Sequence, residues 1–450
     1  MIQSKHLKQP FNLETGNRIN ELPDKLLCHI LAFLPTRCAV ATSILSKRWM
    51  YVWTNVPVLD FMDLPSSMTS SDIYFNEIQY VRFKNYVNRF LLLNGSPCLE
   101  RVHFEAYKGF LPIHVYEWML VIARRCVLEL CVISKHFSVK IPSNFFVDKE
   151  KLTVLKLEGP FELDMLASFD LPCLQILSLS EVVFLNKDDP LSSILSSSEV
   201  LKELNIDRCK GLKEISVCSS SLKTLRIVTL NIEEAFLIKT PNLKVLHLSI
   251  RRILQSVVNE LCSLVEARLH IWTSSVRWIK LLQKICYTKT LVLHSIILDG
   301  SNYHNQLPVF QNLTRLEVGF TSWSIVLQIL RYAPHLQCLI IHKLMYDWPC
   351  ISKIKRNRLS LEKIEYYGFD VEVGFEVVRY FLSNSALLNE LKIHTRPWLD
   401  AMAENEILKM LLTLPRASNQ CEIIIVGEDN ACMSEDSDSD SEFDWSECER

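Results

Sequence analysis

One arrangement of apolar and polar residues recurs along most of the chain: L-x-x-L-x-L, with isoleucine, valine or an aromatic residue at some apolar positions. Side chains alternate between the two faces of a strand, so the fourth and sixth residues of each copy point to the same side. The first leucine is expected to pack inward where the chain enters the strand. Thirteen copies start 21 to 28 residues apart: LERVHF at Leu99, VLELCV at Val127, LTVLKL at Leu152, LQILSL at Leu174, LKELNI at Leu201, LKTLRI at Leu222, LKVLHL at Leu243, LVEARL at Leu264, TKTLVL at Thr288, LTRLEV at Leu313, LQCLII at Leu336, LEKIEY at Leu361 and LNELKI at Leu388.

This spacing and period are typical of leucine-rich repeats. A single repeat cannot cover its own apolar edge, so neighbours stack and their strands form a parallel sheet. The segments between strands, such as Glu233–Lys239 and Val276–Cys286, are expected to be helical or irregular and to close the outer arc. Because the repeats vary in length and lack a consistent asparagine, the sequence predicts an α/β solenoid with an irregular horseshoe shape.

The residues between the inward positions remain available for binding on the concave face. Their mixed charges favour a protein or peptide partner over a phosphate-rich one. The candidate target-binding residues are His103, Lys156, Asn205, Arg226, His247, Arg268, Glu317, Glu365 and Lys392. A second outward position gives His270, His294, His342 and His394. Such a row can sense pH or coordinate a ligand, although histidine is also accepted at solvated strand positions without a special role.

The segment from Asn17 to Phe61 has a helical period instead. Leu22-Pro23 opens a helix, since proline is tolerated in the first turn. Pro35 ends this helix, and Thr36 is placed to cap the next one. The apolar positions of the first helix are Leu26, Leu27, Ile30, Leu31 and Leu34, those of the second are Val40, Ile44 and Leu45, and a third short helix presents Trp49, Val52 and Trp53. Because the module is small, it cannot bury all of these side chains. We therefore expect part of its apolar surface to dock on a partner.

The combination LPDxLLxxILxFLPT…TSxLSKRWxxxW resembles the F-box of plant F-box proteins over nearly its whole length. The resemblance implies that this segment binds the Skp adaptor and so joins a cullin–RING ubiquitin ligase. Met50 departs from the family pattern, which often carries a second arginine after the tryptophan. The positions that match the pattern, and that the resemblance assigns to adaptor binding, are Leu22, Pro23, Leu26, Leu27, Ile30, Leu31, Leu34, Pro35, Leu45, Arg48 and Trp49.

The last repeats have a character of their own. Apolar residues predict a helix after Gly374 and a second helix that Pro415 stops, and β-branched residues predict a strand over Cys421–Val426. Together these blocks resemble the FBD domain that follows the repeats in many plant F-box proteins. The expected division of the chain is 17–61 F-box, 62–98 linker and entry to the solenoid, 99–357 leucine-rich repeats, 358–427 FBD with the last repeats, and 428–450 disordered acidic tail.

Charge changes this picture only at the end of the chain. The last segment, from Glu428, holds ten acidic residues against Arg450 alone, a net charge of −9. Such a segment cannot bury enough apolar surface to offset its chain entropy, so we expect it to be disordered. The other 427 residues hold 48 basic and 41 acidic side chains, a net charge of +7. That excess is too small and dispersed for a nucleic-acid footprint, so no nucleic-acid partner is expected.

Several classes of function are not expected from the motifs. There is no run of about eighteen apolar residues, so we expect no membrane span. Fifteen cysteines without an apolar secretory signal indicate reduced thiols and a location in the nucleus and/or cytoplasm. No CxxC pair or cysteine–histidine zinc spacing occurs, so neither a metal site nor a cofactor is expected. The chain also lacks GxGxxG, GxxxxGK, HExxH and GxSxG motifs, so it is not expected to be an enzyme.

Three functions fit these observations. The first is a substrate-recognition subunit, in which the F-box docks the Skp adaptor and the repeats hold an unknown protein for ubiquitination. The second is a ligand-sensing receptor of the same architecture, with Trp272, Trp278 and Trp323 as candidates for an aromatic pocket. The third is an interaction scaffold that binds the adaptor without delivering a target.

Overall fold

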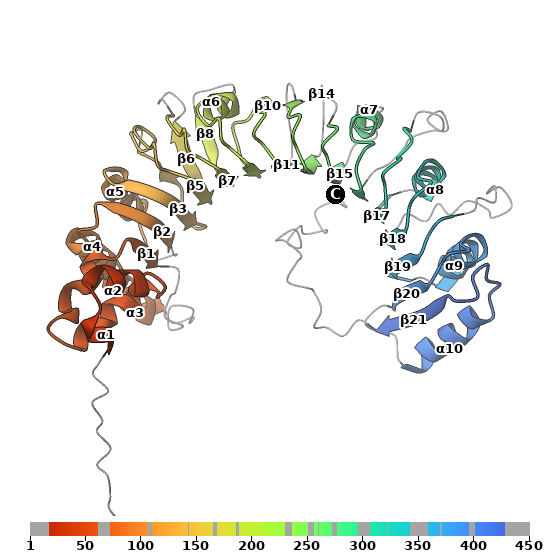
Figure 1. Cartoon of the computed structure of the whole chain (residues 1–450), viewed down its shortest axis with the longest axis horizontal. Helices are drawn as coiled ribbons and strands as arrows, with labels where there is room; N and C mark the ends of the chain where they lie inside the picture. Colours follow the sequence, from red (N-terminus) through yellow and green to blue (C-terminus); the bar gives the residue numbers. More distant parts are fainter. Residues whose placement is uncertain are drawn as a thin grey trace, which may run out of the picture. The chain divides into compact units, whose positions relative to one another are not determined.

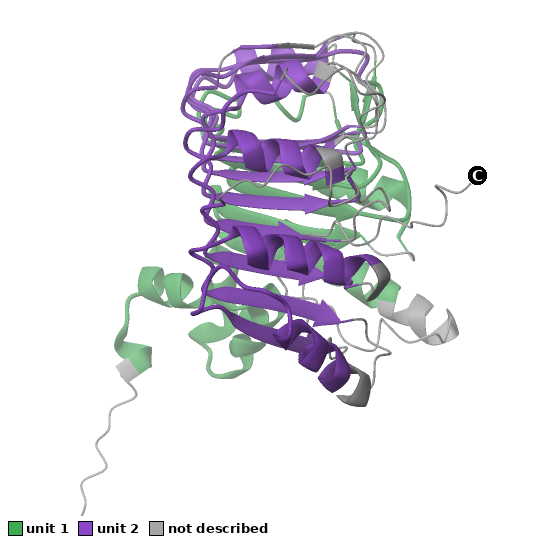
Figure 2. Ribbon diagram, turned by 90° about the vertical axis from the view of Figure 1, so that its right-hand side faces the viewer, with its two compact units in different colours: residues 1–187, 209–211 green, residues 188–208, 212–450 purple. Residues whose placement is uncertain are grey.

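The chain is described by a computed structural model that divides it into two compact units (Figure 2). Unit 1 comprises residues 1–187 with 209–211, and unit 2 comprises residues 188–208 with 212–450. The described residues are 18–61, 73–106, 110–142, 144–164, 169–185, 189–229, 236–250, 256–259, 261–271, 277–295, 307–321, 323–342, 359–369, 371–395 and 401–427. The acidic segment expected to be disordered lies outside these ranges.

Unit 1 begins with the short helices predicted for the F-box. They are α1 (Arg18–Glu21), α2 (Asp24–Leu31), α3 (Thr36–Ala41) and the 3₁₀ turns η1 (Thr42–Ile44) and η2 (Trp49–Asn55). Pro23 and Pro35 stand at the N-cap positions of α2 and α3, where a missing N–H removes no helical hydrogen bond. Asp24 in the first turn of α2 complements the positive end of the helix dipole.

Thr36 corrects one detail of the sequence interpretation. It is the first residue of α3 instead of its cap, and it is buried. Its hydroxyl accepts a hydrogen bond from the backbone N–H of Asp60 at 2.6 Å. This threonine therefore joins the second F-box helix to the strand that follows the module.

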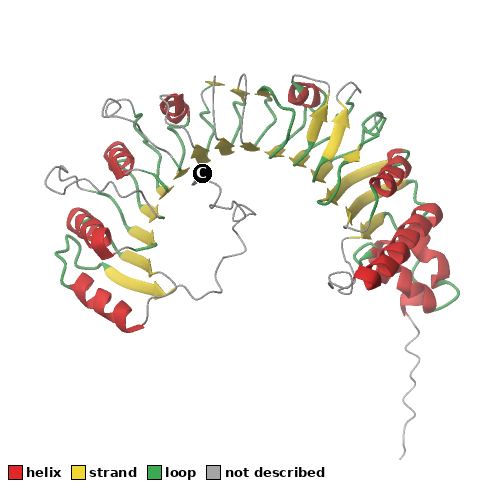
Figure 3. Cartoon of the chain, turned by 180° about the vertical axis from the view of Figure 1, so that it is seen from behind, coloured by secondary structure: helices red, strands yellow, loops and turns green. Residues whose placement is uncertain are grey.

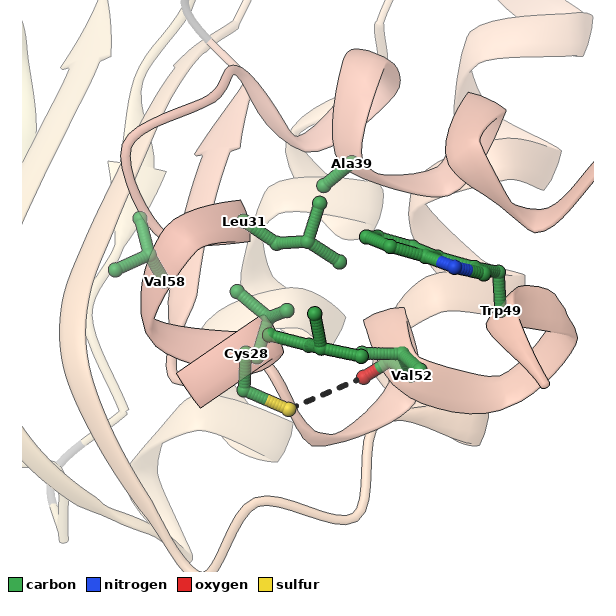
Figure 4. Close-up of a cluster of buried hydrophobic side chains, with 8 residues drawn as sticks. Cys28, Leu31, Ala39, Trp49, Val52 and Val58 are labelled. Carbon is green, nitrogen blue, oxygen red and sulfur yellow. Dashed lines mark hydrogen bonds between the residues drawn. The ribbon is translucent and has the colours of Figure 1, made fainter. Parts of the chain in front are cut away.

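A small apolar core closes the F-box helices onto one another (Figure 4). The thiol of Cys28 donates to the carbonyl oxygen of Val52 at 3.4 Å, which ties α2 to η2 (Figure 4). The buried members of this core are Leu27, Cys28, Leu31, Ala39, Trp49, Val52, Val56 and Val58.

The F-box continues directly into a parallel sheet. In unit 1 the sheet order is β1 (Val58–Phe61), β2 (Cys98–Ala106), β3 (Cys126–Ser134), β5 (Val154–Glu158) and β7 (Ile176–Ser180) (Figure 1). Strand β1 pairs with β2 from Val58↔Arg101 to Phe61↔Phe104. The last residues of the F-box segment therefore form the first strand of the repeats.

Residues 62–98, expected as a linker and entry, contain the long helix α4 (Ile73–Leu93). Its Phe90 ring lies 5.2 Å from Trp53 and 5.7 Å from Phe61, so α4 packs on both the F-box and the first strand. The remaining elements of unit 1 are α5 (Pro112–Ala123) and the small parallel sheet of β4 (Val139–Lys140), β6 (Phe161–Asp164) and β8 (Val183–Leu185).

Unit 2 continues the repeat pattern. Its strands follow the order β9 (Glu203–Asp207), β11 (Thr224–Thr229), β13 (Val245–Ile250), β15 (Glu266–Ile271), β16 (Thr290–His294), β17 (Arg315–Gly319), β18 (Cys338–Ile341), β19 (Lys363–Tyr367), β20 (Glu390–Thr395) and β21 (Glu422–Gly427). The helices are α6 (Pro190–Ser196), α7 (Arg277–Lys284), α8 (Trp323–Tyr332), α9 (Val371–Asn384) and α10 (Ala401–Leu412). Helices α7, α8 and α9 lie on one side of the strands (Figures 1 and 3).

Burial along the strands confirms the prediction of leucine-rich repeats. In the repeat that starts at Leu243, the first, fourth and sixth residues are fully buried. The two of these residues that lie in strand β13 pair with the equivalent residues of the next strand, Leu246 with Ala267 and Leu248 with Leu269. Stacked repeats thus bury the apolar edge that a single repeat would expose.

Two local details differ from the sequence interpretation. The segment Glu233–Lys239 was expected to be helical or irregular, but its described part is strand β12 (Phe236–Lys239). This strand lies in a second parallel sheet between β10 (Ile215–Cys218) and β14 (Ser256–Val258), because neighbouring repeats supply matching strands there.

The helix predicted to follow Gly374 begins at Val371 and so includes this glycine. Glycine is required inside this helix because a Cβ at position 374 would lie 2.5 Å from the ring of Phe369. The second predicted helix corresponds to α10, and the predicted strand corresponds to β21. Among the described helices, none combines the length and apolar character needed to cross a membrane.

Candidate partner-binding surfaces

Helix α2, turn η1 and the residues just after them expose large apolar side chains to solvent. Phe33 is 78% exposed, Ile44 86% and Leu45 65%, and Leu26 and Ile30 on α2 are 49% and 39% exposed. The opposite side of α2 carries Leu27 and Leu31, which are buried in the F-box core. Helix α2 is therefore apolar on two sides, only one of which is covered by the chain itself.

The residues assigned to adaptor binding divide by location. Pro23, Leu26, Ile30, Leu34, Leu45 and Arg48 are exposed, Leu22 and Pro35 are half-buried, and Leu27, Leu31 and Trp49 are buried. A buried side chain offers no surface to a partner, so the last three residues support the exposed ones from within. The sequence pattern did not single out Phe33, and it placed Ile44 on an amphipathic helix without predicting its exposure.

The side chain of Arg48 binds other residues of the F-box and so stabilises the module. Its guanidinium donates to the carbonyl oxygens of Asn20 and Leu22 and forms an ion pair with Asp24 at 2.8 Å. The adjacent Trp49 donates through Nε1 to Asn20 Oδ1 at 2.6 Å. The Arg-Trp pair thus fixes η2 against the segment that leads into α2.

A cavity of about 460 Å³ lies between the F-box helices and α4. Its wall combines aromatic and aliphatic side chains from both elements with the guanidinium-bearing side chain of one arginine. The lining residues are Val40, Ser43, Met50, Tyr51, Trp53, Thr54, Tyr86, Arg89, Phe90 and Leu93.

The candidate target-binding residues share one register position in each unit. In unit 1, His103 and Lys156 both pair with Cys131, which lies between them. In unit 2 a continuous row, which we call the strand row, runs across paired residues of neighbouring strands: Asn205, Arg226, His247, Arg268, Val292, Glu317, Ile340, Glu365 and Lys392.

Polar and charged side chains on and beside the strand row contact one another. Arg226 Nη1 lies 2.7 Å from His247 Nδ1. Lys363, two residues before Glu365, makes ion pairs with Glu365 at 2.8 Å and with Glu390 at 3.1 Å. These two hydrogen bonds are the main reason that the pKa of Lys363 is raised. The row presents both signs of charge, as the sequence indicated.

A second row lies two residues further along each strand. This histidine row consists of His270, His294, Gly319, His342, Tyr367 and His394. Its neighbouring rings are stacked except for those of His294 and His342, which are tilted by 48°. The His270 and His294 rings are 4.7 Å apart at an interplanar angle of 6°. Tyr367 stacks on His342 at 4.9 Å and on His394 at 3.9 Å. The structure thus brings together all four histidines singled out in the sequence and adds a tyrosine to them.

Burial and neighbouring charges shift the pKa values of His294 and of the adjacent Glu317. The pKa of His294 is lowered to about 3, first by burial of the ring and then by charge on His270 and His342. This imidazole is therefore neutral at neutral pH. Burial by itself would raise the pKa of Glu317, but the hydrogen bond from His342 and the nearby charges of His342, His294 and Arg315 lower it overall.

Two of the three tryptophans proposed for a ligand pocket belong to the described residues. Trp278 in α7 and Trp323 in α8 are buried. Trp272 lies outside the described residues. The two described tryptophans therefore act as core residues of the repeats.

Comparison with known proteins identifies an F-box and leucine-rich repeats in the chain. The F-box domain profile matches residues 19–66, and a profile described as "FBD-associated F-box protein At5g56370, LRR repeats" matches residues 115–341. Two proteins of Arabidopsis thaliana are similar over most of the chain. F-box/FBD/LRR-repeat protein At5g56420 is 28% identical over 437 residues, covering 91% of this chain and 98% of that protein. F-box/FBD/LRR-repeat protein At1g78750 is 29% identical over 452 residues, covering 91% and 96%. The chain belongs to the plant family of FBD-associated F-box proteins with leucine-rich repeats.

Proposed function

We propose that this F-box protein is the substrate-recognition subunit of a Skp–cullin–F-box ubiquitin ligase. In this role the F-box docks the Skp adaptor, and the repeats with the FBD bind the protein to be ubiquitinated. The family is of adaptor type and not a known enzyme class, so the chain itself needs no catalytic residues. Its contribution to the reaction is to hold the target near the ligase, which raises the effective concentration of the reacting groups.

The observation that carries this proposal is the uncovered apolar side of α2 and η1. Burying a leucine, isoleucine or phenylalanine that is otherwise exposed contributes about 1.5–3 kcal/mol. Phe33, Ile44 and Leu45 are each more than half exposed, so their burial against a partner would be favourable. A module with its own closed core and a second apolar side fits a docking element better than an ordinary part of a core.

The link between the F-box and the repeats supports the same role. Strand β1 belongs to the parallel sheet, and α4 packs on Trp53 through Phe90. Asn94, just after α4, donates to the carbonyl oxygen of Val56 at 2.9 Å. In unit 1 the F-box is therefore built into the first repeats, so a docked adaptor would be held in a fixed position relative to them.

The mixed charges of the strand row support a protein target. The ligand-sensing alternative loses two of its three aromatic candidates, because Trp278 and Trp323 are buried. We further propose that the protein acts in the nucleus and/or cytoplasm. In support of this location, the cysteines within the described residues are free thiols.

Co-purification of the full chain with a plant Skp adaptor tests the proposal. The informative variant is Ile44→Asp combined with Leu45→Asp, since both side chains are exposed and neither belongs to the F-box core. We expect this variant to lose at least about tenfold in adaptor affinity, because two buried charges would oppose docking. The matched control is Leu92→Asp on α4, which changes a side chain that is 82% exposed and should leave binding intact.

Adaptor binding that survives the double substitution would overturn the assignment of this surface. A reconstituted ligase provides the second measurement. Ubiquitination of the chain itself in that mixture would support the ligase subunit, whereas binding without any ubiquitination would favour the interaction scaffold.

A further inference from the structure

Three potential metal ligands converge in unit 2 from three neighbouring strands. His342 Nε2 lies 3.0 Å from Glu317 Oε1, and His294 Nε2 lies 3.9 Å from the same oxygen. The three donor atoms all lie within 4.8 Å of one another. For a tetrahedral zinc ion with bonds of about 2.0–2.1 Å, donor atoms are separated by about 3.3 Å. Only small side-chain movements would bring the observed separations to that value.

Gly319 creates the space in which these groups meet. Gly319 pairs with His294 on the neighbouring strand. The backbone N–H of His342 donates to the carbonyl oxygen of Val318, the residue before Gly319, at 2.8 Å. A Cβ at position 319 would lie 3.2 Å from both the His294 ring and the Cβ of His342. Because no side chain fills this position, Glu317 can reach between the two imidazoles from two residues earlier on its strand.

One potential metal-ligating atom of the cluster has no hydrogen-bond partner among the described residues. Glu317 accepts a hydrogen bond from His342. The Nε2 atom of His294 is buried and makes no hydrogen bond to any described residue. A buried polar atom without a hydrogen bond is costly, so such atoms in folded proteins call for an explanation. Coordination of a cation by His294, Glu317 and His342 would satisfy this atom.

The rings on either side hold the two imidazoles in place. His270 stacks on His294 at 4.7 Å, and Tyr367 stacks on His342 at 4.9 Å. The hydroxyl of Tyr367 donates to Glu365 Oε2 at 3.3 Å, which fixes its ring in turn. Groups that orient metal ligands raise affinity because little conformational freedom remains to be lost on binding.

We propose that His294, Glu317 and His342 form a binding site for a divalent transition-metal ion of the zinc class. Two imidazoles and one carboxylate are a donor set that zinc uses in proteins, with the remaining coordination position open to water or to an external ligand. Calcium and magnesium prefer all-oxygen sites, which this cluster does not provide. Glu317 belongs to the strand row, so a side chain of a protein bound there could occupy the open position.

Cobalt(II) is the probe that tests the site, because its visible absorption reports coordination geometry and its near-ultraviolet absorption reports thiolate ligands. The full chain is stripped with a chelator and titrated with Co²⁺, and Zn²⁺ is then added in competition. We expect one Co²⁺ per chain, a tetrahedral visible band without thiolate charge transfer, and displacement by Zn²⁺. Glu317→Gln and His342→Gln are each expected to weaken binding at least about tenfold.

Two further variants separate the site from general effects. His335→Gln removes an exposed histidine from the same repeat, before strand β18, and should leave Co²⁺ affinity unchanged. Gly319→Ala keeps all three donor atoms but crowds the His294 ring, so it should weaken binding without removing a ligand. Far-ultraviolet circular dichroism of the metal-free variants verifies that each one folds. In addition, Zn²⁺ should raise the Tm of the unaltered chain and not that of Glu317→Gln.

Three results would overturn the proposal. The first is a Co²⁺ affinity that is the same in the unaltered chain, Glu317→Gln and His342→Gln. The second is a spectrum dominated by thiolate charge transfer, which would assign binding to cysteines. The third is the absence of any tetrahedral visible band from the unaltered chain.

Discussion

Helix α2 of the F-box and strand β5 of the repeats both contain closely spaced leucines, yet they place them differently. Helix α2 buries Leu27 and exposes Leu26 beside it. Strand β5 buries Leu155 and Leu157 and exposes Lys156 between them. In this strand, the period of two separates core from surface. In the helix, apolar residues occupy two sides, and only one of these sides packs against the rest of the F-box.

This difference indicates two kinds of interaction. An exposed apolar helix side is suited to a partner that is used repeatedly, because non-directional burial provides the free energy. The polar strand row offers charges at fixed positions, which contribute selectivity more than affinity. In the proposed function, the F-box would bind a common adaptor and the strands would bind a particular target.

Replacing a buried and an exposed leucine of α2 by alanine is expected to give the largest difference in the free energy of unfolding. Leu31→Ala removes a buried side chain from the F-box core and should lower the free energy of unfolding by about 2–5 kcal/mol. Leu26→Ala changes a half-exposed side chain and should cost less than about 1 kcal/mol. Urea unfolding followed by circular dichroism measures both values. Equal losses of stability would remove the distinction between the covered and uncovered sides of α2.

Substitution of Arg48 tests whether an exposed F-box residue stabilises the module itself or contacts the adaptor. Arg48→Met removes the hydrogen bonds to Asn20 and Leu22 and the ion pair with Asp24, and the expected loss is about 1–2 kcal/mol because the group is partly exposed. The neighbouring Lys47→Met should change stability by no more than about 0.5 kcal/mol. The same unfolding measurement applies. If Arg48→Met left stability unchanged and abolished adaptor binding, this arginine would be a contact residue instead of an internal clamp.

The smallest expected effect concerns His103 on the strands of unit 1. Burial lowers its pKa, and of the charged groups around it Asp60 and Glu129 raise the pKa while Arg101 and Lys156 lower it. The unfolded chain then binds this proton more readily than the folded chain, so the free energy of unfolding falls as pH drops below about 6.5. The difference in stability between the unaltered chain and His103→Gln should therefore shrink between pH 7 and pH 5. A constant difference over that range would contradict the burial effect.

Most of the fold could be predicted because it repeats. The first, fourth and sixth residues of every L-x-x-L-x-L copy are buried, with Thr288 at the one position where a leucine is replaced by a polar residue. Helical spacing likewise located the F-box helices. It could not tell Leu26 from Leu27, because the covered side of α2 is decided by Trp49 and Val52, which arrive more than twenty residues later.

The spacing of motifs in the sequence could not predict the candidate metal site. His294, Glu317 and His342 are 23 and 25 residues apart, which is the period of the repeats and not that of a zinc motif. The sequence accordingly predicted no metal site. Parallel pairing of β16, β17 and β18 converts this repeat distance into a few ångströms, and Gly319 leaves the gap that lets the three side chains meet.

The sequence by itself determined the order of the parts, the number of short strands expected from the L-x-x-L-x-L copies, and the side of each strand that is buried. These properties depend on local periodicity, which any one segment carries within itself. The tertiary structure decided which apolar residues of the F-box stay exposed, how α4 joins the F-box to the first strands, and which polar groups become neighbours. Those outcomes depend on pairing between segments that are far apart in the chain, and no local pattern records that pairing.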